Sequence, residues 1–246
     1  MTQVLYISLG AVINFVIGFV LADLVDEKYK TTLKSLFQKD IYRQVLFGLI
    51  LSILSIPLIQ YYLLNNPSLV YIQGFLISNL MLIIFLFAAY YDIRYFRVLD
   101  KLTQFVIFYL IGLNSSVIYY LTNEPNVVLF NNYQYNPLSN LIAGALAWLI
   151  FYTIVTITKE RGMGSGDIRI ATIIGLSLGV GKFILSFYIS IFSALLVAGF
   201  LYLINRKDVS FKTKIPFVPF LVIGGLLALY LPVDFFDIIS QIYLPI

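Results

Sequence analysis

The chain has 246 residues, of which 61% are hydrophobic and 11% are charged. An average soluble domain carries about 25% charged residues, so this composition excludes a water-facing globular surface and predicts a polytopic membrane protein. The chain contains no Cys and no His, which excludes thiolate and imidazole catalysis, disulfides and zinc–thiolate sites. Any chemistry must therefore use Asp, Glu, Lys, Arg, Tyr, Ser or Thr, and no metal or cofactor is expected.

Uninterrupted apolar stretches predict an all-α membrane bundle of about eight transmembrane helices. In chain order these stretches are Val4 to Ala22, Val45 to Leu64, Leu69 to Tyr90, Phe105 to Leu121, Leu138 to Ile157, Ile168 to Gly181, Phe183 to Asn205 and Ile215 to Leu231. The sixth is short for a span, and its step from Gly175 to Gly179 favours close packing of helices inside the bundle.

The formal net charge of +4 is the difference between 16 Lys and Arg residues and 12 Asp and Glu residues, and the basic residues are regularly distributed along the chain. Apart from Lys182, they lie in or beside every second connection between the apolar stretches. The positive-inside rule therefore puts these connections in the cytoplasm and the N-terminus outside. Because the basic residues do not form one patch with stacking aromatic side chains, nucleic-acid binding is not expected. The lipid bilayer is the expected partner.

Two of the 12 acidic residues lie at predicted membrane boundaries. Asp92 follows the third apolar stretch, and Asp167 directly precedes the sixth. The predicted topology puts both on the cytoplasmic side, and a carboxylate at such a boundary needs a partner or a water-filled cavity. Two carboxylates that share one proton can hydrolyse a peptide bond. Two alternatives stay open: Asp167 is a helix cap, or the pair forms a proton or cation path in a carrier.

A glycine-rich run, Gly162-Met-Gly164-Ser-Gly166, leads directly into Asp167. Glycines allow another backbone to approach closely, so the run suits an extended peptide docked beside a catalytic acid; a flexible turn is the alternative. A phosphate-binding loop is not expected, because no strand precedes the run and no Gly-Lys-Ser/Thr follows it.

Three segments carry a recognisable pattern: Gly164 to Asp167 reads GxGD, Asp92 to Thr103 ends in Asp100-Lys-Leu-Thr, and Ile215 to Phe220 reads Ile-Pro-Phe-Val-Pro-Phe. In their order along the chain and in their spacing, these segments resemble the type IV prepilin peptidases, a family of membrane aspartic proteases. The resemblance covers Asp92 to roughly Leu231. The chain departs from the family's usual pattern at Leu99, Val218 and Arg169, where Pro, Gly and Lys are common.

The resemblance implies that Asp92 and Asp167 are the catalytic pair. It also implies prepilin or pseudopilin substrates of type IV pilus or type II secretion systems, whose short basic leader is cut at the cytoplasmic face of the inner membrane. One alternative is an intramembrane protease similar to presenilin and signal peptide peptidase, which also carry GxGD. An alternative of another class is a small proton- or cation-coupled carrier that would use Asn14, Asn79 and Asn114, the deep amides.

Further residues are candidates for binding the substrate. Asp100 and Glu160 could offset the basic loops and receive a basic leader, although ordinary loop charge explains both equally well. Pro216 and Pro219 belong to the last-span motif and are the other candidates.

The chain is predicted to consist of two parts. Residues 1–68 form a two-helix region with a short cytoplasmic loop, and residues 69–246 form the protease core. Many bacterial type IV prepilin peptidases carry two zinc-binding CxxC pairs in this loop. These members also have an activity that methylates the cleaved product. The loop from Asp23 to Gln44 has no Cys, which excludes zinc there and makes methylation doubtful.

Overall fold

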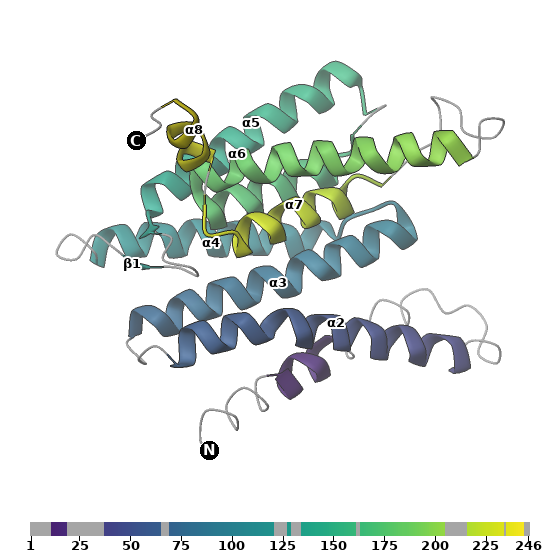
Figure 1. Ribbon diagram of the computed structural model, residues 1–246, viewed down its shortest axis with the longest axis horizontal. Helices are drawn as coiled ribbons and strands as arrows, with labels where there is room; N and C mark the ends of the chain where they lie inside the picture. The colour runs from purple at the N-terminus through teal and green to yellow at the C-terminus, as the bar shows by residue number, and fades with distance from the viewer. Residues whose placement is uncertain are drawn as a thin grey trace. The chain divides into compact units, whose positions relative to one another are not determined.

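The computed structural model describes residues 11–18, 37–64, 69–120, 127–128, 134–160, 163–204, 216–233 and 235–243 (Figure 1). Residues 11–18 are helical, and the other helices are α2 (Phe37–Leu64), α3 (Leu69–Tyr95), α4 (Asp100–Tyr120), α5 (Pro137–Thr158), α6 (Ser165–Ile204), α7 (Val218–Tyr230) and α8 (Phe235–Tyr243). The helical fold class is confirmed. A short two-stranded sheet, β1 (Val127–Val128) and β2 (Gln134–Tyr135), lies between α4 and α5 and was not predicted.

The chain divides into two compact units. One consists of Met1–Phe87 with Val128–Phe130, and the other of Ala88–Val127 with Asn131–Ile246. Asp92 and Asp167 both belong to the second unit.

In the first unit, the helix of residues 11–18 packs closely against its neighbours. A Cβ placed on Gly48 of α2 would lie 2.7 Å from the carbonyl oxygen of Phe15, so the two backbones are nearly in contact. The Nδ2 of Asn79 in α3 donates to Oδ1 of Asn14 across 3.3 Å. Polar bonds of this kind hold membrane helices together, which favours a packing role for these two amides over an ion path.

In the second unit, α5, α6 and α7 lie side by side (Figure 1). A Cβ on Gly175 of α6 would lie 2.6 Å from the carbonyl oxygen of Ala143 in α5, so only glycine allows this approach. The close packing expected for the sixth stretch is therefore present. Asn114 of α4 donates from Nδ2 to the Leu176 carbonyl oxygen at 3.1 Å, so this deep amide also links two helices.

Helix α6 is interrupted at Gly179, where φ is 76° and ψ is 177°. This backbone conformation is open essentially to glycine alone, and it separates α6 into two helical segments. They correspond to the sixth and seventh predicted spans. After the interruption, the Val180 N–H donates to Ser139 Oγ at 3.2 Å, so the start of the second segment is tied to the start of α5.

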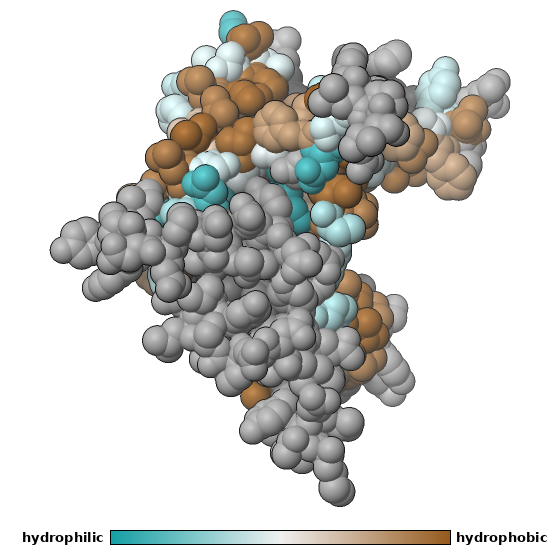
Figure 2. Space-filling view, turned by 60° about the vertical axis from the view of Figure 1, so that its left-hand side comes forward, coloured by the Kyte–Doolittle hydropathy of each residue, from teal (hydrophilic) through white to brown (hydrophobic). Residues whose placement is uncertain are grey.

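The helices have the apolar character of membrane helices. Among the described residues, Pro137–Thr158 and Ser165–Leu203 are long and apolar enough to cross a membrane, and Val45–Ile59 and Val218–Tyr230 are shorter apolar helices. Large hydrophobic side chains are exposed along the second half of α6, including Phe192, Leu195, Leu196, Phe200 and Leu203. Figure 2 shows broad hydrophobic areas on the face in view. The count of eight spans and the external N-terminus remain predictions.

Helix α8 follows α7 and was not among the predicted helices. The Phe235 ring of α8 stacks on Tyr188 of α6, with ring centroids 5.6 Å apart, while Asp237 is exposed. The segment is thus a short helix whose described contacts with α6 include an aromatic pair.

Candidate active site

Asp92 lies in the last turn of α3, two residues beyond the predicted span that ends at Tyr90. Its side chain is 7% exposed, and its Oδ2 accepts a hydrogen bond of 3.3 Å from the backbone N–H of Val218, the first residue of α7. Burial raises the pKa of Asp92 to about 6, and the Val218 hydrogen bond acts in the opposite direction. Asp92 can therefore exist in either protonation state near neutral pH.

A tight turn follows Asp92 and leads into α4. Phe96 has a φ of 51°, and its N–H donates to the Asp92 carbonyl oxygen at 2.8 Å. A left-handed residue of this kind commonly ends a helix. At the start of α4, the Thr103 hydroxyl donates to the Leu99 carbonyl oxygen at 2.9 Å. The segment from Asp92 to Thr103 thus forms a fixed turn between two helices.

Asp167 lies in the first turn of α6 and is also 7% exposed. Its Oδ2 accepts a 2.8 Å hydrogen bond from the N–H of Gly164, the residue directly before the helix. An acidic side chain that reaches back in this way satisfies a free donor at a helix start. The carboxylate therefore caps α6, and one of its oxygens is used for this purpose. The cap interpretation and the catalytic interpretation are compatible.

Gly166 brings the two aspartate segments together. A Cβ on Gly166 would lie 2.6 Å from Cγ2 of Val98, which follows Asp92 in the turn. At Gly164 the nearest atom, the Gly166 nitrogen, is 4.0 Å away, so a side chain could be accommodated. Gly162 lies outside the described residues. Three loop glycines were predicted, and the described contacts require glycine at one of these positions, Gly166.

An ion pair makes a second connection between the same segments. The Arg169 guanidinium in α6 donates to the Asp100 carboxylate at the start of α4. The Asp100 side chain is 68% exposed and that of Arg169 is 18% exposed. Burial raises the pKa of Asp167 to about 6, the Gly164 hydrogen bond acts in the opposite direction, and the negative charge of Asp92 raises the pKa further.

One protein family matches this part of the chain. The model of the type IV leader peptidase family matches residues 79–199, a range that contains both aspartates and the ion pair. This segment belongs to the type IV leader peptidase family. The match identifies the chain as a peptidase and confirms the resemblance on which its sequence was interpreted. The search of curated proteins and the search of solved structures each return no match.

The other candidate residues of this peptidase lie at helix ends. Glu160 is exposed just beyond α5, with a φ of 58°. Pro219 is at the start of α7, a position where a missing N–H has little effect, and Pro216 precedes the helix. Pro219 therefore fits a structural role at a helix start, while Asp100 is already engaged by Arg169.

Sequence reasoning missed two features of the peptidase. The first is the Val218 N–H, because a backbone donor is present whatever the side chain. The second is Lys182, which the sequence interpretation left as an exception to the charge pattern; it lies inside α6 and is 1% exposed. A single charge in an otherwise apolar stretch was the available signal for Lys182.

Proposed function

We propose that the protein is a membrane aspartic endopeptidase that removes the basic leader from type IV prepilins or pseudopilins. Asp92 and Asp167 are the catalytic pair, and the site faces the cytoplasm at the inner membrane. The observation that carries the proposal is the approach of two buried carboxylates, each accepting one backbone N–H, within the segment matched by the family model. Carboxylates exposed to water on a protein surface would be neither buried nor in electrostatic interaction with each other.

The chemistry follows from one proton shared by the pair, since two close like charges cannot both ionise readily. The ionised carboxylate takes a proton from water as the water oxygen bonds to the scissile carbonyl carbon. The protonated carboxyl group gives its proton to the carbonyl oxygen. As the tetrahedral intermediate collapses, the C–N bond breaks and the first carboxyl group gives the proton taken from water to the leaving nitrogen. A hydroxyl group of the intermediate returns its proton to the second carboxylate as the C=O bond of the product acid forms. The pair is regenerated without a cofactor.

The orientation is supported by the basic residues around Asp92. Arg94, Arg97 and Lys101 all lie within nine positions of Asp92, and positive charge marks the cytoplasmic ends of membrane helices. A prepilin leader is cut on that side, just before the substrate's hydrophobic helix. The exposed carboxylates of Asp100 and Glu160 are the proposed contacts for its basic residues, and Pro216 and Pro219 are the proposed contacts near α7.

The test is cleavage of a co-expressed prepilin in a host without its own prepilin peptidase. Asp92→Asn and Asp167→Asn should each reduce cleavage by about 10³-fold or more, because each removes a proton-transfer group. Asp237→Asn, which changes an exposed aspartate in α8, is the matched control and should cleave normally. Undiminished cleavage by either active-site variant would refute the pair.

The mass of the new N-terminus distinguishes the related possibilities. A cut directly before the hydrophobic helix supports prepilin processing, whereas a cut inside the helix supports the presenilin-like alternative. The same mass reports whether the product is methylated.

A further inference from the structure

Three charged side chains are buried among the described residues: Asp92, Asp167 and Lys182. The first two form the proposed catalytic pair, and the third has no part in the mechanism above. A buried ammonium group is strongly destabilising unless hydrogen bonds or an opposite charge compensate it. Lys182 therefore requires a structural explanation.

The Lys182 Nζ donates to the carbonyl oxygen of Leu231 at 2.9 Å. Leu231 is the cap residue that directly follows α7, and its own N–H donates back to the Leu227 carbonyl oxygen at 2.9 Å. The carbonyl groups at the end of a helix lack partners within the helix. The ammonium group thus binds the residue that caps the C-terminal end of α7.

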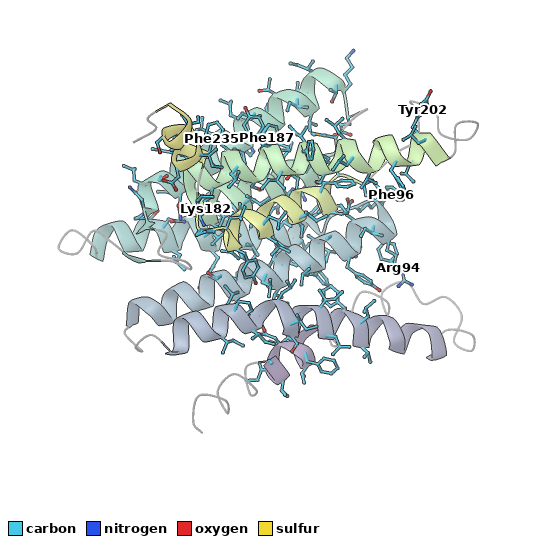
Figure 3. All side chains as sticks on the ribbon, viewed as in Figure 1. Arg94, Phe96, Lys182, Phe187, Tyr202 and Phe235 are labelled. Atoms are coloured by element: carbon cyan, nitrogen blue, oxygen red, sulfur yellow. The ribbon has the colours of Figure 1, made fainter. Side chains whose placement is uncertain are left out.

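The positive end of the same helix meets Asp92. The Val218 N–H donates to Asp92 Oδ2, and the preceding residue Phe217 makes no side-chain capping bond. Figure 3 shows Lys182 on the left of the view and Arg94 and Phe96, which follow Asp92 in the chain, on the right. A cation and a catalytic carboxylate therefore contact opposite ends of α7.

The middle of α7 packs closely against α6. A Cβ on Gly224 would overlap Ser190 Oγ and the Ser186 carbonyl oxygen of α6, so the helices meet through small groups. The directional bonds at the two ends are better suited to set the axial position of α7. A shift of roughly 0.5 Å would already weaken a hydrogen bond of this length.

We propose that Lys182 is a positioning residue for the catalytic pair. By holding the C-terminal end of α7, it fixes the helix along its axis and so keeps the Val218 N–H on Asp92. Lys182 does not touch the substrate. This inference rests on the proposed function, but its structural part can be tested without activity.

The variants are Lys182→Met, which keeps the length of the side chain and removes the charge, and Lys182→Arg, which restores a cationic donor. Val222→Ala is the control, because it removes packing from a buried position in the middle of α7. Prepilin cleavage and hydrogen–deuterium exchange of the peptide covering residues 216–222 are measured on the full-length protein.

We expect Lys182→Met to lower kcat by about 10- to 100-fold, as a small displacement of a catalytic group does, with KM within about twofold. The same variant should speed exchange in residues 216–222, and Lys182→Arg should recover most of both properties. Val222→Ala should lower the Tm with a much smaller loss of kcat. Unchanged exchange in Lys182→Met, or an arginine variant as impaired as the methionine variant, would overturn the inference. If wild-type protein cleaves no prepilin, the proposed function fails while the exchange result still decides the role of Lys182.

Discussion

Arg169 and Asp100 form an ion pair that joins the N-terminal part of α6 to the first turn of α4. Each of these helices begins beside one of the two aspartates, since Asp167 precedes Arg169 by two positions and the Asp92 turn leads into α4. The pair lies at an exposed position, so its net contribution to stability is expected to be small. Its larger effect should be on the relative position of the two segments.

Arg169→Gln and Asp100→Asn should each reduce cleavage by about three- to tenfold while lowering stability by less than about 1 kcal/mol. Because both changes break the same contact, the double variant should be no worse than either single one. A double-mutant cycle on kcat/KM and Tm measures this. Strictly additive losses in kcat/KM would contradict a shared role.

Gly166→Ala should strongly impair the enzyme. The added methyl group would overlap Val98 and force the two aspartate segments apart, at a cost of about 1–3 kcal/mol for overpacking. Gly164→Ala is the matched control, because open space surrounds that position and alanine keeps the N–H that binds Asp167. Cleavage rates of the two variants are compared, and combining Gly166→Ala with Val98→Ala should restore part of the activity. Equal effects at positions 164 and 166 would speak against the close contact.

Asp92→Asn should stabilise the protein at neutral pH and not at low pH. Burial raises the pKa of Asp92 from 3.8 to about 6, so the folded state favours the protonated form. The wild-type protein therefore loses stability as the pH rises from about 4 through about 6, and the uncharged amide avoids this loss. Thermal unfolding in detergent should show a Tm several degrees higher for Asp92→Asn at about pH 7.5 and nearly equal values at about pH 4. Asp237→Asn controls for a general charge effect, and a Tm difference that does not change with pH would exclude this explanation.

Gly179→Ala should lower stability by about 1–3 kcal/mol or more, because a Cβ is poorly tolerated at the backbone angles of the α6 interruption. The control is Gly199→Ala, which lies in the second helical segment with nothing within 4 Å of the added atom. In a helix interior alanine is favoured over glycine, so this control should be neutral or stabilising. Thermal unfolding of the two variants gives the comparison, and similar Tm values for both would contradict the special geometry at Gly179.

The sequence predicted the helices well because long apolar runs determine them. Leu138 to Ile157 was expected, and Pro137–Thr158 was found. The break in α6 was expected after Gly181 and occurs at Gly179, since several glycines stood close together and only the tertiary structure selects among them. Helix α8 was missed because it is short and contains no long apolar run.

The contacts of the site were less accessible to sequence reasoning. The aspartates were identified from their positions at membrane boundaries and from motifs, but the Val218 N–H and the pairing of Arg169 with Asp100 depend on how helices distant in sequence meet. The predicted set of deep amides was also incomplete, because it omitted Asn140, which is 1% exposed. Its place near the start of an apolar stretch resembled an ordinary helix end.

The hydrogen bond from the Gly164 N–H to Asp167 couples the protonation state of Asp167 to the stability of the start of α6. An ionised carboxylate at a helix start stabilises the first turn more than a neutral one does. If Asp167 gains and loses a proton during turnover, as proposed, the first turn of α6 should be held less tightly in the protonated state and more tightly in the ionised state. We therefore expect the order of Gly164, whose N–H binds this carboxylate, to change in step with proton transfer.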